Sequence, residues 1–172
     1  TTIVAQPHVP VPGGPLDYQD ESALHDRRDL ACFTSAPLES PMVVGGTPTA
    51  HVDTTSDRPR HDLIATLHRV EPDGTARVIS GYASRMLEAA PIGETIRWTL
   101  ELRPIAIRLE TGDRLRLTLS ASRFPCYDRN SHTTRQSAAT ALAEQAVATI
   151  GFGRIELELP TLPVDQRPKS KD

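Results

Sequence analysis

The stretches that decide the fold are Glu94–Leu102 (ETIRWTLEL) and Arg114–Ala121 (RLRLTLSA). In both, apolar and polar residues alternate one by one, so every second side chain points to the same face of an extended strand. Arg154–Leu159 (RIELEL) repeats the pattern. Strands with one apolar and one polar face are typical of an antiparallel sheet that buries one side. These segments therefore predict β-strands, with Trp98 on the buried face of the first.

Shorter strands are predicted around these three from apolar and β-branched residues bounded by turns. The alanine-rich stretch Ser137–Ala148 predicts either a short helix or a loop that leads into a further strand. The shorter strands are Leu30–Thr34, Met42–Val44, Thr49–Asp53, Asp62–Val70, Ala76–Ser80 and, on the second interpretation, Val147–Ile150.

The segment Asp62–Val70 is expected to place Leu63, Ala65 and Leu67 on one face. The turn sequence EPDG at 71–74 joins it to Ala76–Ser80, and this predicts a β-hairpin. Eight or nine short strands joined by turns predict an all-β fold, a β-sandwich. The long 125–147 connection favours a jelly roll, although the pattern alone leaves an immunoglobulin topology open.

Three parts of the chain differ in composition. Residues 1–20 contain Pro7, Pro10, Pro12 and Pro15 and are predicted to form an extended proline-rich N-terminal arm. Residues 21–162 are predicted to form the sandwich. Residues 163–172 are polar, and we expect a disordered tail.

Composition excludes several classes of protein. The net charge is −3, from 19 basic and 22 acidic residues, which argues against nucleic acid or an acidic membrane as partner. No apolar run reaches the length of a membrane span. The two cysteines, Cys32 and Cys126, are expected to be reduced thiols, with a single bridge between them as the open alternative.

No catalytic motif occurs in the chain. The G-x-S-x-G elbow, the H-E-x-x-H helix, the phosphate-binding loop and the dinucleotide fingerprint are all absent from the sequence. His61-Asp62 and His25-Asp26 resemble catalytic fragments, but a surface position is expected for each histidine. A third ligand for a metal cannot be placed beside His51 and Asp53. The sequence therefore predicts no catalytic residue, no metal site and no cofactor.

The loop Phe124–Asn130 has two interpretations. As a ligand or interface loop, it would present Arg129 as a two-pronged hydrogen-bond donor. As a corner, Phe124 and Tyr127 would close the end of the sandwich, Asp128 would cap a turn and Arg129 would pair locally. Asn130 belongs to the loop in either case.

Four stretches in the same order resemble one family. They are Pro10–Gly14, Arg28–Leu38, Asp62–Gly74 and Phe124–Asn130. Together they resemble the C-terminal domain of the X-prolyl dipeptidyl-peptidase, cocaine esterase and α-amino-acid ester hydrolase (CocE/NonD-type) family, over about residues 7–160. The resemblance implies a jelly-roll sandwich of the galactose-binding-like type, preceded in such enzymes by an α/β-hydrolase domain.

In that family the catalytic serine, aspartate and histidine lie in the hydrolase domain, and none of their motifs occurs here. The resemblance thus makes the chain part of a serine hydrolase without deciding whether it is itself an enzyme. The start at Thr1 fits a segment of a larger enzyme, and His8 replaces a residue that is usually acidic in the family. By resemblance, the arm would line the domain interface near the active-site mouth through Val9, Pro10, Val11, Pro12, Gly13, Gly14 and Leu16.

The predicted function is a non-catalytic C-terminal accessory domain that shapes the active-site entrance and supports domain or subunit contacts. Its partner would be an α/β-hydrolase catalytic domain in the same or a separate chain, and a homo-oligomer is left open. The alternative is a freestanding carbohydrate-binding module, but aromatic residues are few and Trp98 is expected in the core. A cupin-type metalloenzyme is disfavoured because the histidines are dispersed. Substrate and compartment stay undetermined, with the cytoplasm favoured.

Overall fold

The computed structural model describes residues 1–5, 20–86, 88–124, 126–134 and 146–164. These residues form strands and one short 3-10 helix, η1 (Ser22–Leu24). No helix in this part of the chain has the length and apolar character needed to cross a membrane. The strands are β1 (Thr2–Ala5), β2 (Leu30–Thr34), β3 (Met42–Gly46), β4 (Thr49–Ser56), β5 (Asp62–Val70), β6 (Ala76–Arg85), β7 (Ile96–Glu101), β8 (Ile105–Leu109), β9 (Arg114–Ser120), β10 (Ala148–Glu158) and β11 (Thr161–Leu162).

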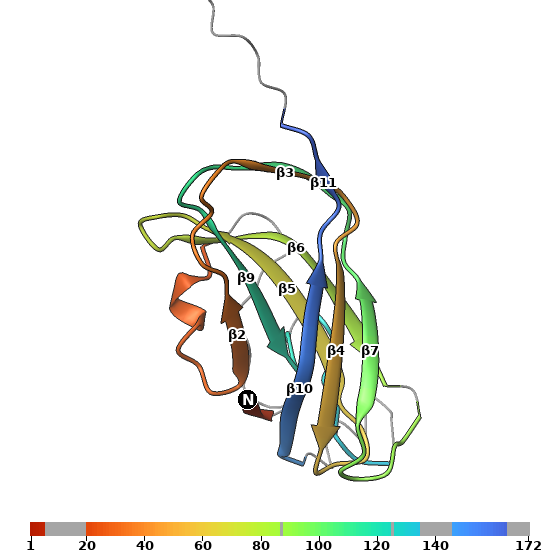
Figure 1. Cartoon of the computed structure of the whole chain (residues 1–172). Coiled ribbons are helices and arrows are strands. Elements are labelled where there is room, and N and C mark those ends of the chain that lie inside the picture. Colours follow the sequence, from red (N-terminus) through yellow and green to blue (C-terminus); the bar gives the residue numbers. More distant parts are fainter. Residues whose placement is uncertain (6–19, 87, 125, 135–145, 165–172) are drawn as a thin grey trace, which may run out of the picture.

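Two four-stranded antiparallel sheets pack face to face (Figure 1). Sheet I has the order β1-β10-β4-β7 and sheet II the order β2-β9-β5-β6. Along the chain, these strands alternate between the two sheets except in the β5–β6 hairpin. This alternation is the jelly-roll topology, and the predicted all-β sandwich is confirmed. Sheet III, with the order β11-β3-β8, lies at one end of the sandwich.

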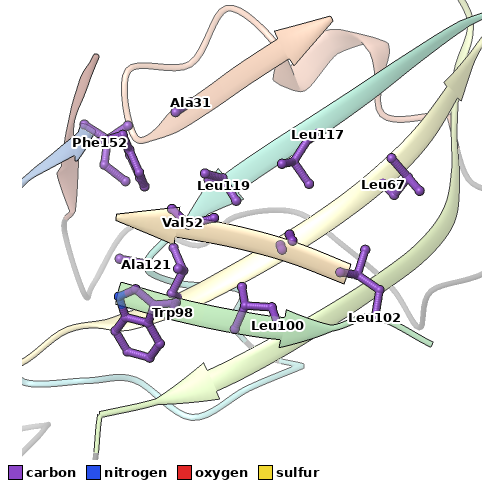
Figure 2. Packing of buried hydrophobic residues seen from close by; sticks show 14 of the residues in the cluster. Ala31, Val52, Leu67, Trp98, Leu100, Leu102, Leu117, Leu119, Ala121 and Phe152 are labelled. Carbon is purple, nitrogen blue, oxygen red and sulfur yellow. The ribbon is translucent and has the colours of Figure 1, made fainter. Parts of the chain in front are cut away.

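The core lies between sheets I and II, as Figure 2 shows for Val52, Trp98, Leu100, Leu117 and Leu119. The alternation in β7 and β9 places these apolar side chains inward. Each buried leucine contributes about 1.5–3 kcal/mol relative to an exposed one. Trp98 is in the core, as predicted, and its indole Nε1–H donates to Thr54 Oγ1 at 2.8 Å. The only polar atom of the ring therefore has a partner.

The bounds predicted for β2 and β5 are confirmed, and the predicted hairpin joins β5 to β6. In its turn the Gly74 amide donates to the Glu71 carbonyl at 2.9 Å, with Gly74 at φ 93°, a conformation that glycine adopts without strain. The strands β4 and β6 extend beyond their predicted ends. One strand, β10, spans the two segments predicted separately, with an irregularity in its pairing with β4 between Phe152 and Ile155.

The face of β5 that carries Leu63, Ala65 and Leu67 is buried, and the opposite face is buried as well. Two chain segments, residues 20–21 and the loop after β9, contribute side chains that cover this outer face. The polar residues Asp62, Thr66 and His68 of β5 are therefore buried.

Three strands were missed. The first, β1, falls within the predicted arm but pairs with β10 and buries Ile3 and Ala5. The others are β8 and β11, which pair with β3. Residues 6–19 of the arm, 135–145 and the tail from 165 lie outside the described residues. Cys32 and Cys126 are not joined by a disulfide bond, so the alternative of a bridge between them is not realised.

Candidate functional site

The loop that follows β9 runs back over the outer face of sheet II. The Tyr127 amide donates to the Arg123 carbonyl at 3.0 Å, which turns the chain. The Arg129 guanidinium lies over the Phe124 ring, 4.0 Å from its centroid. This stacking is a local cation–π contact, of the kind that the corner interpretation expects of Arg129.

Asp62, at the start of β5, fastens this loop to sheet II. Asn130 Nδ2 donates to Asp62 Oδ1 at 2.7 Å, and Arg85 Nη2 donates to Asp62 Oδ2 at 3.1 Å. The same Arg85 nitrogen donates to the Asp128 carbonyl at 2.8 Å. Burial raises the pKa of Asp62, against the opposing effects of Asn130 and Arg85. A carboxylate bound this way is a structural anchor whose oxygens are already occupied.

A second buried group lies over the middle of β5. Arg123 Nη2 donates to Glu21 Oε1 at 2.5 Å and Arg123 Nη1 to Thr66 Oγ1 at 3.1 Å. His68 Nε2 donates to Glu21 Oε2 at 2.9 Å. Burial acts to raise the pKa of Glu21, but the hydrogen bond from His68 and the charge of Arg123 hold it below its usual value. Sequence reasoning missed this cluster, because Glu21 and Arg123 are 102 positions apart.

The expectation of surface histidines is wrong for His61, His68 and His132, which are 0%, 2% and 2% exposed. His61 Nε2 lies 3.0 Å from Thr54 Oγ1, and its ring meets the Trp98 ring edge-on. Burial, together with the neighbouring His132, lowers the pKa of His61 to about 4. The rings of His61 and His132 are therefore buried groups whose protonation is disfavoured, rather than exposed proton carriers.

His132 closes the base of the loop between β9 and β10. Its Nδ1–H donates to the Ala146 carbonyl at 2.9 Å, and the Ala146 amide donates to the Ser131 carbonyl at 3.1 Å. His132 has φ 60°, and its backbone amide donates to Asn130 Oδ1 at 2.8 Å. Burial lowers the pKa of His132, although its hydrogen bond to Ala146 opposes the shift.

A cavity of about 250 Å³ lies between this loop and the outer face of β5 and β6. Of the five loop residues singled out from the sequence, Tyr127 and Asp128 line it, whereas Phe124, Arg129 and Asn130 contact neighbouring protein groups instead. Among its polar lining residues, Asp62 and Arg85 already bind each other. The lining residues are Asp62, Ile64, Ala83, Ser84, Arg85, Ser122, Arg123, Tyr127 and Asp128.

One arrangement on sheet I resembles a hydrolytic triad. Thr99 Oγ1 lies 3.1 Å from His51 Nδ1, and His51 Nε2 lies 3.5 Å from Glu158 Oε1. The three residues stand on β7, β4 and β10, on the open outer face of the sheet. They border neither of the two cavities described in this structure. An exposed threonine on a flat face has no pocket to hold a substrate or exclude water.

The remaining predicted site residues belong to the arm. The arm residues Val9, Pro10, Val11, Pro12, Gly13, Gly14 and Leu16 lie outside the described part of the chain. Within that part, no three histidine, cysteine, aspartate or glutamate side chains form a group that could hold a metal ion.

The family of the chain is indicated by comparison with known proteins rather than by the geometry of the site. The family described as the X-Pro dipeptidyl-peptidase C-terminal non-catalytic domain matches residues 4–154. Cocaine esterase of Rhodococcus sp. (strain MB1 Bresler) is 31% identical over 164 residues, which cover 86% of this chain. The chain spans only 29% of that relative's length.

Solved structures share the fold at lower sequence identity. An aminopeptidase from a marine sediment archaeon, Thaumarchaeota archaeon, superposes with a TM-score of 0.86 at 19% identity, over 95% of this chain and 33% of its own. An α-amino acid ester hydrolase gives 0.86 at 20% identity, over 94% and 32%. A CocE/NonD family hydrolase from Staphylococcus aureus gives 0.58 at 14% identity, over 94% and 33%.

Proposed function

Because the chain belongs to the family of X-Pro dipeptidyl-peptidase C-terminal non-catalytic domains, we propose that it serves an α/β-hydrolase-type serine hydrolase as an accessory domain. In this role it shapes the entrance to the active site and supports domain or subunit contacts. The observation that carries the proposal is the family match over residues 4–154, in a chain that spans 29% of the length of cocaine esterase. The family resemblance seen in the sequence is thereby confirmed.

The contacts within the chain support a non-catalytic role. The buried histidines His61, His68 and His132 bond to Thr54, Glu21 and Ala146, so they are engaged in holding strands and loops together. The histidine–hydroxyl pair His51–Thr99, which lies on an open surface, is outside both described cavities. The chemistry of ester or amide cleavage would thus come from the hydrolase domain, in the same or a separate chain.

We assign the arm residues Val9–Leu16 to the interface with that hydrolase domain, near its active-site mouth. This assignment rests on the family resemblance and on the apolar character of the arm. A homo-oligomer built through the same domain is compatible with the accessory role.

A freestanding carbohydrate-binding module is less well supported. Such modules stack sugars on exposed aromatic rings. Among the aromatic residues that the structure describes, Trp98 and Phe152 are buried, Phe124 is covered by Arg129, and Phe33 and Tyr127 are half-buried, which leaves Tyr82 as the exposed ring. One exposed ring does not make a stacking platform.

The test is a chromogenic short-chain ester assay on the chain alone and after mixing with a separately produced hydrolase domain of the parent gene. We expect no turnover by the chain alone, and a gain in activity or thermal stability on mixing. Turnover by the isolated chain that survives host-esterase controls would overturn the proposal. An absence of any gain on mixing would count against it as well.

A further inference from the structure

The end of the sandwich opposite sheet III carries exposed apolar side chains. We name it the loop end, and it comprises residues 57–60, 88–95 and 146–147 together with β1 at its edge (Figure 1). Ile92 is 64% exposed, Val147 43% and Val4 40%. In the described part of the chain, only Tyr82 and Leu162 are comparably exposed large hydrophobic residues, and Leu162 lies at the opposite end.

The loop that carries Ile92 is held to the loop between β4 and β5. The Ala90 amide donates to the Pro59 carbonyl at 2.9 Å, and the Gly93 amide donates to the Ser56 carbonyl at 2.9 Å. These two bonds flank Ile92 on either side. The most exposed apolar side chain is therefore presented by a loop with fixed ends.

The segment that carries Val147 is held to the same β4–β5 loop. Arg58 Nε donates to the Val147 carbonyl at 2.9 Å. The Asp57 amide donates to the Thr149 carbonyl at 3.2 Å, and the Thr149 amide donates back to Asp57 Oδ1 at 2.8 Å. Residues 57–59 thus act as a brace between the loops of Ile92 and Val147.

This bracing matters for binding because ordering a loop on association costs free energy, and a surface that is already ordered avoids that cost. Removing exposed isoleucine and valine side chains from water on association is favourable. The ordered apolar surface of the loop end is therefore better suited to lasting contact with a partner protein than to exposure to solvent.

We propose that the loop end is the docking surface for the α/β-hydrolase domain, an inference that rests on the proposed function. The family is a C-terminal domain, and cocaine esterase has about 71% of its length outside the region that this chain spans. A C-terminal domain is joined to the rest of its protein through its own N-terminal side. Here Thr1 accepts a hydrogen bond from the Phe152 amide at 2.8 Å, and β1 lies toward the loop end. The opposite end carries β11 and the C-terminal side.

The chemistry of the partner surface follows from the side chains present. It needs an apolar depression for Ile92 and Val147, and polar groups that meet the half-exposed Asp57 and Arg58. The outer face of sheet I is less suited. Its Arg97 is paired with Asp53 at 3.7 Å and Glu156 at 3.6 Å, and covering these charges would remove their hydration.

The experiment compares Ile92→Asp and Val147→Asp with the wild-type chain in titration calorimetry against the separately produced hydrolase domain. Leu162→Asp is the matched control, since Leu162 is 52% exposed at the other end. Circular dichroism and thermal melting check that each variant is folded. We expect the dissociation constant to rise by about tenfold or more for each loop-end variant, as for central interface residues, and to stay unchanged for Leu162→Asp.

The outcomes separate the two proposals. If the wild-type chain does not bind the hydrolase domain, the proposed function fails and the docking surface with it. If the wild-type chain binds and the folded loop-end variants bind equally well, only the docking surface is overturned. If sedimentation shows that the wild-type chain self-associates and Ile92→Asp abolishes this, the occupant is a second copy of the chain, and the assignment to the hydrolase domain is wrong.

Discussion

The outer faces of the two sheets carry polar side chains in similar patterns but in opposite environments. On sheet I, the side chain of Arg97 is 56% exposed and its ion pairs lie in water. Over the outer face of sheet II, the side chain of Arg123 is 5% exposed and is bonded to Glu21, whose side chain is 8% exposed. The difference shows that alternation predicts which residues share a face, while segments distant in the sequence decide whether that face meets solvent.

The largest effect is expected at Arg123. Arg123→Met leaves the buried Glu21 carboxylate without its strongest partner, and the free energy of unfolding should fall by about 3–5 kcal/mol in urea denaturation. The double variant Glu21→Gln/Arg123→Met removes the stranded charge and should recover part of this loss. A decrease below about 1 kcal/mol for Arg123→Met would show that sheet II is no more dependent on its charges than sheet I.

The next largest effect is expected on the free energy of unfolding at acidic pH, through the buried His61. The folded pKa of His61 is about 4, below its ordinary 6.5, so between these values the unfolded state binds the proton and the folded state does not. Stability should therefore fall as the pH drops from about 7 to about 4, by up to about 3 kcal/mol for this one group. The raised pKa of Asp62 offsets part of the loss at the acid end.

The measurement is urea denaturation of the wild type and of His61→Phe at several pH values between 7 and 4. The variant keeps the ring contact with Trp98 and lacks the titrating group. Its stability should depend less steeply on pH. Equal slopes for both proteins would mean that the pKa of His61 is the same in the folded and unfolded states.

A smaller effect is expected at Asn130. Asn130→Ala leaves Asp62 Oδ1 and the His132 amide without their partner, and the free energy of unfolding should fall by about 1–3 kcal/mol. Hydrogen exchange should also accelerate at the His132 amide. If exchange there is unchanged, the loop is held by its other contacts, such as Arg85 to the Asp128 carbonyl.

The smallest effect is expected on the open face. Arg97→Met removes exposed ion pairs with Asp53 and Glu156, and the free energy of unfolding should change by about 0–1 kcal/mol. Raising the salt concentration should shrink the difference further. A loss as large as that of Arg123→Met would remove the distinction between the two faces.

The parts of the fold that could be predicted are those set by local pattern. Alternation located β7 and β9, and turn chemistry at 71–74 located the hairpin. The four-residue β1 was hidden by the proline-rich residues that follow it, since four residues are too few to show a period. The five-residue β8 shows alternation in Ile105, Ile107 and Leu109 that could have revealed it.

The candidate site was less predictable, because its contacts join distant positions. The loop Phe124–Asn130 could be singled out from its aromatic and charged residues. Its partners Asp62 and Arg85 carry no local signal, and neither does Glu21, which binds Arg123, or the burial of His61. A histidine next to an aspartate gives the same sequence pattern whether it is buried or exposed. The positions of the segments that cover it in the folded chain decide between the two.

The strand order has a consequence for synthesis of the chain on the ribosome. In sheet I, β10 lies between β1 and β4, so residue 2 pairs with residue 151. Nearly the whole chain must leave the exit tunnel before β1 can pair with β10. The same is true of the pairing of β4 with β10, its second neighbouring strand. Until then both strands present unpaired edges, which are prone to join other chains. The sandwich therefore closes in a late step, after any domain encoded upstream has had time to fold.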